Sequence, residues 1–237
     1  MGAAGLPQWL TMDFKSRIDL FRDAIGFEGL GDAQIQQIGG LSFTKGFSKG
    51  AIVFSESDAC NYFHLVAKGL VKVSLVSYGG NRITYLLAGS GEPLNLVGPF
   101  SGAPRPLCAE VLEDALVVHV KREDFTTFCY ENPAVMHNII IILGRAVDSA
   151  NSRILDMMEM RVEQRLLRVL LTLYRKFGKT LDFTSIELAE MAGTTTESTL
   201  RVMARLRQSE IVQTRRGQIQ ILQVEHLERA GSESMWI

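Results

Sequence analysis

The sequence has little that would indicate a membrane, an export route or a disulfide framework. Its best apolar run, at 138–143, is far shorter than the roughly 20 residues that a membrane-spanning helix needs. The first ten residues lack the charged start and long apolar middle of a secretory signal. Cys60, Cys108 and Cys129 form no CxxC pair, which argues against disulfide, zinc and iron–sulfur frameworks. We therefore expect a reduced, cytoplasmic protein with no membrane partner, in which Cys108 and Cys129 are small core residues.

The chain also lacks the residue arrangements of an enzyme. No Ser/His/Asp set, metal-ligand set or phosphate-binding loop has a convincing spacing, so we predict no catalytic residues, no bound metal and no enzymatic activity. The net charge is only −1, which gives the whole chain no basic character. Residues 161–217, however, contain 11 Lys and Arg against 6 Asp and Glu. This local excess of positive charge makes the C-terminal third the candidate for contact with nucleic acid.

Residues 41–120 alternate between apolar and polar positions and are interrupted by frequent glycines. Short strands separated by turn residues are typical of an all-β barrel or sandwich, and Gly79-Gly80 is a plausible hairpin turn within it. The first 20 or so residues have no clear pattern.

After Pro133 the apolar spacing becomes helical and continues for about seven turns. This stripe either packs only on the chain's own barrel or forms a seam with a second copy of the chain. The second interpretation is favoured, because the stripe is narrow and alternates with Arg145, Asp148 and Arg153. Its members are Val135, Ile139, Ile142, Leu143, Ala146, Val147, Ala150, Ile154, Met157 and Met158.

From Arg161 onward the sequence predicts a separate small helical domain. Thr184 with Glu187, and Thr194 with Glu197, have the spacing of N-terminal capping boxes, and Gly193 lies between them. Two helices joined by a short turn with a glycine are typical of a helix-turn-helix. The following segment, 211–222, alternates around Arg216-Gly217, which predicts a hairpin, the wing of a winged helix.

The second of these helices is the candidate recognition helix. Glu197 and Arg201 are one turn apart on its outer side, and Leu200, Met203 and Leu206 are assigned to the side that packs on the domain. Arginine can pair with guanine O6 and N7, and glutamate can accept from cytosine N4, so together they could read a G·C pair. The alternative is an ordinary surface ion pair worth tenths of a kcal/mol.

Contacts to the DNA backbone are assigned to the start of the candidate recognition helix and to the tip of the wing. Thr195 and Ser198 lie at the start of the helix, where hydroxyls and backbone N–H groups suit phosphates. Thr196 faces the bases beside Glu197. Arg215 and Arg216, in the wing, are expected to pair with phosphates without reading sequence.

The whole order of segments resembles the CRP/FNR family of bacterial transcription regulators, from about Phe27 to Arg229. The stretches that carry the resemblance are "VFSESDACNYFHLVAKGLVKV", "FSGAPRPLCAEVLEDALVV" and "ELAEMAGTTTESTLRVMARLRQSEIV". It implies an α+β fold with an N-terminal cyclic-nucleotide-binding-like β-roll (jelly roll) in 1–130, a long dimerisation helix in 131–160 and a C-terminal winged helix-turn-helix in 161–237. It also implies a homodimer on a palindromic double-stranded DNA site, with RNA polymerase as a partner if the protein is an activator.

The resemblance assigns base reading to Glu197 and Arg201. This sequence differs from the family pattern in two places. Thr196 stands where cyclic-AMP-responsive members have another arginine, so the preference at that base step is open. In the β-roll, Asn95-Leu96 stands where the family has a Gly-Glu pair for the ribose, and Arg105-Pro106 where it has an Arg-Ser pair for the phosphate.

These departures suggest a small-molecule effector other than a cyclic nucleotide. Leu96 cannot accept a hydrogen bond from a ribose hydroxyl, and Pro106 has neither a hydroxyl nor an N–H for a phosphate. Arg105 could still bind an anionic end, with Leu96 in an apolar wall, so an organic anion fits this region. A cyclic-nucleotide regulator with an atypical pocket is the alternative. From another functional class, the β-roll could bind a ligand while the helical domain acts as a protein-interaction module.

We predict no cofactor, although the four histidines leave haem open. His64 and His119 lie in strand patterns, where a hydrogen-bonded histidine is commoner than a haem ligand, and His137 and His226 lie outside them.

Overall fold

The computed structural model describes residues 11–229 and divides the chain into two compact units. One unit comprises residues up to Val76 together with Leu86–Gly144, and the other comprises Ser77–Tyr85 together with residues from Arg145 onward. The elements of the chain through the long helix are α1 (Phe14–Asp23), α2 (Asp32–Gly40), β1 (Ser42–Phe47), β2 (Ile52–Phe54), β3 (Tyr62–Val76), β4 (Arg82–Ala88), α3 (Gly98–Ser101), β5 (Cys108–Lys121), α4 (Arg122–Glu131) and α5 (Pro133–Glu159).

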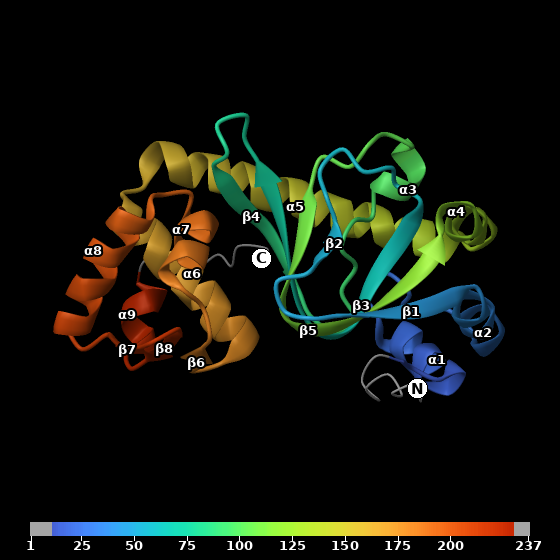
Figure 1. Ribbon diagram of the computed structural model, residues 1–237, viewed down its shortest axis with the longest axis horizontal. Coiled ribbons are helices and arrows are strands. Elements are labelled where there is room, and N and C mark those ends of the chain that lie inside the picture. The colour runs from blue at the N-terminus through green and yellow to red at the C-terminus, as the bar shows by residue number, and fades with distance from the viewer. Residues whose placement is uncertain (1–10, 230–237) are drawn as a thin grey trace, which may run out of the picture. The chain divides into compact units, whose positions relative to one another are not determined.

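The first unit is built on an antiparallel sheet with the strand order β1-β5-β3-β4, and β2 pairs with β5. Helices α1, α2 and α4 gather at one end of this sheet (Figure 1). The expected β-rich segment is confirmed. So is the Gly79-Gly80 turn, which belongs to the second unit and in which the N–H of Gly80 donates to the Ser77 carbonyl at 2.8 Å. Helices α1 and α2 were not predicted, because the N-terminal residues show too short a periodic pattern.

Alternation along β3 and β5 gives the sheet two different faces. Phe63 lies on the face that meets α4, where its ring stacks on Phe125 with centroids 4.0 Å apart. The next residue, His64, points to the opposite face and is in register with His119, which is in turn opposite Phe43 on β1. One face of the sheet therefore carries an aliphatic and phenylalanine core, and the other carries a histidine-rich aromatic cluster.

The long helix α5 confirms the helix predicted after Pro133, but its apolar residues divide into two sets. Val135, Ile139, Ile142 and Ala146 are buried within the chain, and Ile142 lies against Gly26. A second set, exposed or half-buried, is spaced at alternating intervals of four and three residues. It consists of Met136, Ile140, Leu143, Val147, Ala150, Ile154 and Met157.

The second unit contains the end of α5 and a helical domain with a small sheet of order β6-β8-β7. Leu166, Val169, Leu170 and Leu173 form the buried face of its first helix. No helix among residues 11–229 is long and apolar enough to cross a membrane. The elements of this domain are α6 (Val162–Phe177), β6 (Thr180–Leu181), α7 (Ser185–Ala192), α8 (Thr196–Gln208), β7 (Val212–Arg215), β8 (Gln218–Ile221) and α9 (Val224–Glu228).

Candidate nucleic-acid interface and effector site

Helices α7 and α8 form the predicted helix-turn-helix. Thr184 caps α7 through a reciprocal pair of bonds: its Oγ1 accepts from the N–H of Glu187 at 3.3 Å, and its N–H donates to Glu187 Oε2 at 2.6 Å. Gly193 ends the helix with φ of 60°, a left-handed conformation that suits glycine. The first capping box and the glycine turn are thus confirmed.

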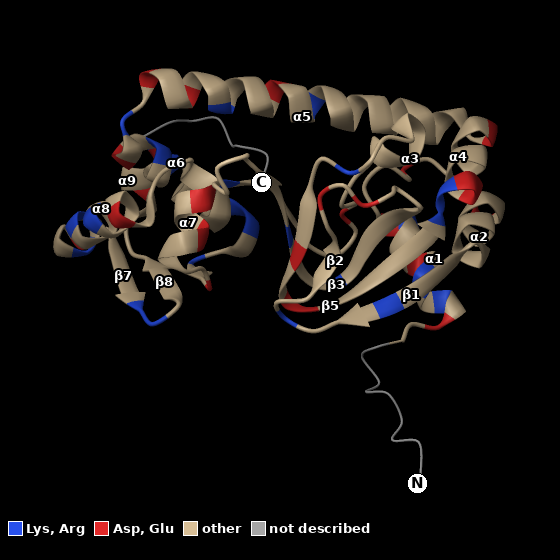
Figure 2. Ribbon diagram, turned by 45° about the horizontal axis from the view of Figure 1, so that its top comes forward, with Lys and Arg blue, Asp and Glu red and all other residues tan. Residues whose placement is uncertain are grey.

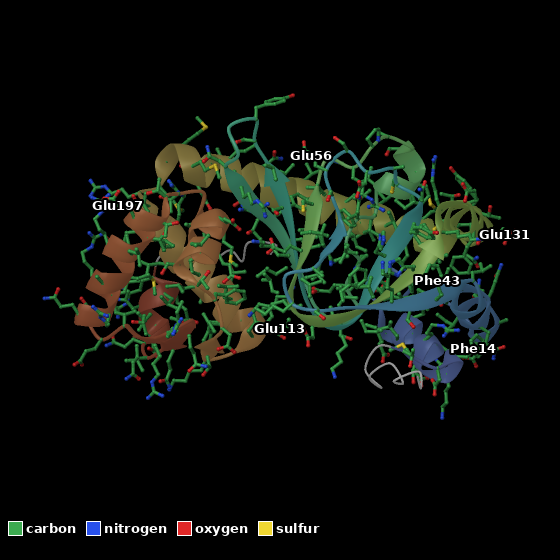
Figure 3. All side chains as sticks on the ribbon, viewed as in Figure 1. Phe14, Phe43, Glu56, Glu113, Glu131 and Glu197 are labelled. Atoms are coloured by element: carbon green, nitrogen blue, oxygen red, sulfur yellow. The ribbon has the colours of Figure 1, made fainter. Side chains whose placement is uncertain are left out.

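The second capping box was placed one residue too early. Thr195, not Thr194, is the N-cap of α8, and its Oγ1 accepts from the N–H of Ser198 at 3.2 Å. The Thr195 hydroxyl also donates to Ser198 Oγ at 3.0 Å. Glu197 is consequently free of the capping role and extends from the first turn of the helix, where Figure 3 shows it pointing outward.

Glu197 and Arg201 share the outer side of α8, as predicted from their spacing. The Arg201 Nη2 atom lies 3.9 Å from Glu197 Oε1, and their side chains are 67% and 82% exposed for Arg201 and Glu197. Arg201 Nη2 also donates to Ser198 Oγ at 3.4 Å. With so much of each side chain in solvent, this ion pair contributes little to stability, and both groups are available to a ligand.

The inner side of α8 differs from the prediction at one position. Thr199, Val202, Met203 and Leu206 are buried, whereas Leu200 is 54% exposed. Met203 and Leu206 are therefore packing residues as expected, but the assignment of Leu200 to the packing side is wrong. Leu200 projects 100° around the helix from Thr199, which places it at the border of the buried face.

The wing is the β7–β8 hairpin, and Arg215 and Arg216 are exposed at its tip. Gly217 follows with φ of 73°, which permits the tight turn. Figure 2 shows the basic colour of this tip and of α8 in the same domain. Of the residues predicted to contact the DNA backbone, Thr195, Arg215 and Arg216 are exposed, and Ser198 is half-buried.

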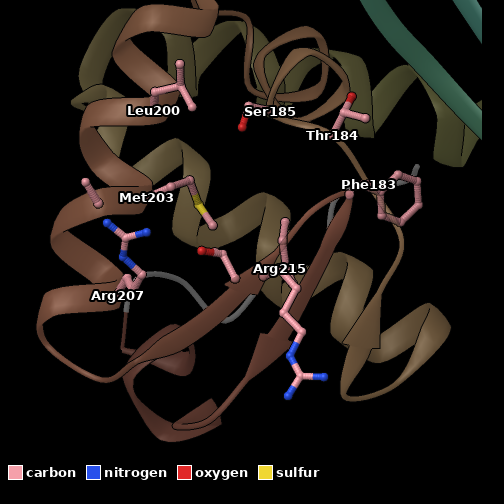
Figure 4. A pocket seen from close by; sticks show the side chains of 11 residues that line it. Phe183, Thr184, Ser185, Leu200, Met203, Arg207 and Arg215 are labelled. Atoms are coloured by element: carbon pink, nitrogen blue, oxygen red, sulfur yellow. The ribbon is translucent and has the colours of Figure 1, made fainter.

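A groove of about 430 Å³ lies between α8, the start of α7 and the wing (Figure 4). Leu200, Met203 and Ala204 line it from α8, while Arg207 and Arg215 bring positive charge to it. An apolar wall bounded by two arginines is suited to an elongated anionic ligand that also has apolar parts.

Two arginines hold the turn of the helix-turn-helix. Arg153, near the end of α5, donates to the carbonyls of Thr84 at 2.6 Å and Met191 at 2.9 Å. Arg165 on α6 donates to the carbonyls of Ala192 at 3.0 Å and Gly193 at 3.3 Å. Sequence alternation suggested a polar outer position for Arg153, but the structure buries it.

In the β-roll, the residues aligned with a ribose-binding pair are occupied by local structure. Asn95 Oδ1 accepts from the N–H groups of Val97 at 3.1 Å and Gly98 at 3.0 Å, so it fixes the start of α3. The Leu96 side chain is buried. Leu96 is therefore part of the core, and its side chain has no atom that could accept a hydrogen bond.

Arg105 is buried rather than on the surface, with 3% of the residue exposed. Its Nη2 donates to the Tyr62 carbonyl at 2.8 Å and lies 3.4 Å from His64 Nδ1. Its guanidinium carbon lies 4.0 Å from the centre of the Phe54 ring, within cation–π distance. Among the described residues, Nη1 has no hydrogen-bond acceptor. Arg105 therefore keeps one set of donors for another group.

His64 and His119 lie in the aromatic cluster beside Arg105, with their ring centres 4.6 Å apart. Burial lowers the pKa of His119 to about 4 and, with the neighbouring His119, holds the pKa of His64 well below 6.5. Both rings are thus neutral at pH 7. His137 is exposed on α5 and His226 is half-buried on α9. No group of three or more His, Cys, Asp and Glu residues in 11–229 could hold a metal ion.

Comparison with known proteins finds two family models on this chain. A cyclic nucleotide-binding domain matches residues 44–132, and a Crp-like helix-turn-helix domain matches residues 164–230. The first covers the β-roll, and the second covers the domain that carries α8 and the wing.

Individual relatives agree with the two models. The chain is 28% identical to a cyclic AMP receptor protein of Thermus thermophilus over 77% of this chain and 85% of that protein. It is 25% identical to the fumarate and nitrate reduction regulatory protein of Vibrio cholerae over 84% and 82% of the two chains. The solved structure of the c-di-GMP responsive regulator CLP of Xanthomonas campestris, 17% identical, matches in fold with a TM-score of 0.73 over 81% of this chain and 99% of that chain. The chain therefore belongs to the CRP/FNR family of DNA-binding transcription regulators.

Proposed function

We propose that this protein acts as a cytoplasmic homodimer that binds a palindromic DNA site, reads a G·C pair in each half-site with Glu197 and Arg201, and responds to an effector other than a cyclic nucleotide. The observation that carries the proposal is the exposed Glu197–Arg201 pair on the outer side of α8. RNA polymerase is a partner if the regulator activates transcription.

Base reading by α8 is tested by removing Arg201. Arginine pairing with guanine contributes about 1–3 kcal/mol of discrimination, so Arg201→Ala should lose that amount and accept other base pairs at the same position. Arg215→Ala and Arg216→Ala, which remove phosphate contacts, should weaken binding to all sequences and lower the salt dependence. Fluorescence titrations with matched duplexes would contradict the assignment if Arg201→Ala kept full discrimination.

The homodimer is proposed from the second apolar set on α5. Its alternating spacing of four and three residues is that of a coiled-coil seam, and Ile140 and Val147 in it are 63% and 58% exposed. Two copies joined along this seam would present their recognition helices about 34 Å apart, one turn of DNA. Ile142 and Ala146, although in the predicted stripe, are buried within the chain, and substituting them would test folding instead.

Val147→Asp should therefore produce monomers, because it would place an unpaired charge in the seam. Arg145→Glu changes the charge at an exposed position off the seam and should leave the dimer intact. Analytical ultracentrifugation distinguishes the two. A dimeric Val147→Asp variant would place the contact elsewhere.

The effector proposal is supported by the surroundings of Arg105 and Leu96. Arg105 already donates to the Tyr62 carbonyl and stacks on Phe54, and Leu96 is part of the core. A ribose hydroxyl and phosphate oxygens would each lose about 1–3 kcal/mol without replacement partners. The two N–H groups of Arg105 Nη1, which have no acceptor among the described residues, suit an anionic group, so an organic anion is proposed.

Calorimetry with cyclic AMP and cyclic GMP at millimolar concentration should show no saturable heat and no gain in DNA affinity. Micromolar binding of either would favour the alternative, a cyclic-nucleotide regulator, which the Thermus thermophilus relative also favours by its name. An absorption spectrum of the purified protein tests for haem, which would give a Soret band.

A further inference from the structure

Two rows of side chains run along the outer part of α8, and only one of them is charged. Glu197 and Arg201 form the charged row. Thr196 and Leu200 form a second row beside it, also one turn apart, in which Thr196 is half-buried and Leu200 is 54% exposed. Leu200 therefore offers an apolar surface beside the charged row, and burying this surface against a ligand would be favourable.

The groove shows what kind of ligand can cover Leu200. In Figure 4 Leu200 lies on α8 at one end of the groove, and Arg207 and Arg215 lie further along it on α8 and the wing. Two cations flank the apolar surface that Leu200 and Ala204 present, so a ligand with anionic groups on its outside and an apolar group facing Leu200 would fit. A DNA strand has this combination, since phosphates lie on its outside and the C5-methyl group of thymine lies in the major groove.

We propose that Leu200 contacts the methyl group of a thymine next to the G·C pair that Glu197 and Arg201 read, and that each half-site therefore prefers a T·A pair at that position. The inference rests on the proposed function, because it takes the charged row of α8 to lie in the major groove. The proposal also predicts which base is preferred on the side of α8 that carries Thr196, the position where cyclic-AMP-responsive members of the family have an arginine. Leucine and the methyl of threonine select by apolar contact and carry no hydrogen-bond donor for guanine.

Replacing thymine by deoxyuridine tests this contact, because the two bases differ only by the methyl group. A binding duplex is first selected from random sequences with the wild-type dimer. Removing the methyl at the assigned position should then weaken binding by about fourfold in each half-site, which corresponds to the burial of one methyl group. The same replacement at a thymine outside the half-sites serves as the DNA control and should change nothing.

The protein side of the test uses Leu200→Ala, which should bind the thymine and deoxyuridine duplexes equally. Leu222→Ala provides a matched control, since Leu222 is an exposed leucine of the same domain outside α8 and the groove, and it should keep the fourfold difference. The wild-type comparison of the two duplexes does not depend on any variant folding.

The outcomes separate this inference from the proposal beneath it. Failure to select any specific duplex would refute the proposed function. A selected duplex whose G·C pair depends on Arg201, but which binds equally well with deoxyuridine, would overturn the thymine contact alone. Loss of affinity in Leu200→Ala that is the same for both duplexes would also overturn it, because it would place Leu200 against a sugar.

Discussion

Replacing Arg153 by methionine should loosen the turn of the helix-turn-helix without changing the exposed side chains of α8. The guanidinium of Arg153 joins the Thr84 carbonyl to the Met191 carbonyl at the end of α7, and methionine keeps the aliphatic volume but has no donor. A hydrogen bond from a charged donor contributes about 1.5–3 kcal/mol, and both carbonyls lose theirs. Allowing for partial hydration of the two oxygens, we expect Arg153→Met to cost about 3 kcal/mol. Arg153→Lys, which cannot reach both carbonyls at once, should cost less.

Hydrogen exchange measures this loss where it occurs. The N–H of Thr194 bonds to the Ala189 carbonyl at 3.0 Å inside the turn, so its exchange reports on local opening. A loss of about 3 kcal/mol should speed that exchange by roughly two orders of magnitude. Arg145→Met removes an exposed arginine from the same helix and should change stability by less than about 0.5 kcal/mol. Unchanged exchange at Thr194 in Arg153→Met would refute the view that this arginine holds the turn.

Three further outcomes follow from the β-roll and its helices. The pKa of His119 is about 4 in the folded protein and near 6.5 in the unfolded chain, so its contribution to the free energy of unfolding should be fully present above pH 6.5 and lost as the pH drops toward 4. The expected loss at pH 5 is about 2 kcal/mol. Urea denaturation of His119→Phe should show a smaller fall over the same pH range. Gly69→Ala should destabilise the protein by about 3 kcal/mol or more in thermal unfolding, because Gly69 has φ of +85° and a Cβ there would overlap the Asp114 carbonyl. Gly80→Ala is the control: Gly80 has a similar φ but open space around it, so the substitution should cost only about 1 kcal/mol. Burial raises the pKa of Cys129 to about 12, so mass spectrometry should find it unmodified by iodoacetamide at pH 8 in the folded protein.

Local signals in the sequence were enough to locate the DNA-binding elements. The Thr184–Glu187 box, Gly193 and the hairpin around Gly217 each depend on backbone groups within a few residues, so the sequence itself determines their conformation. The cap of α8 was displaced by one residue because Thr194 and Thr195 are equally good caps by type. The three-dimensional position of Thr194, whose N–H is already bonded to Ala189, leaves the role to Thr195.

The orientation of long helices required tertiary information. On α5 two apolar sets are interleaved at helical spacing, and periodicity alone cannot tell which set the chain buries for itself. Ile139 and Ile142 meet their own chain, while Ile140 and Val147 do not. The same ambiguity placed Leu200 on the inner side of α8.

The sequence also gave no indication that Arg105 would be buried, and its burial changes how this site can select a ligand. A surface arginine offers all of its donors to an anion, but here Nη2 is already engaged by the Tyr62 carbonyl and the ring face by Phe54. Nη1 has no acceptor among the described residues, and each charged hydrogen bond that it makes would contribute about 1.5–3 kcal/mol, which corresponds at most to a millimolar-range contact when one bond acts alone. Because this contact is common to any anion that reaches Arg105, it cannot distinguish one anion from another. If the proposed organic anion binds at Arg105, discrimination between anions would come from the part of the ligand that meets the buried aromatic and histidine side chains. His64 is among them, and it is neutral, so the selection would be by shape and apolar contact.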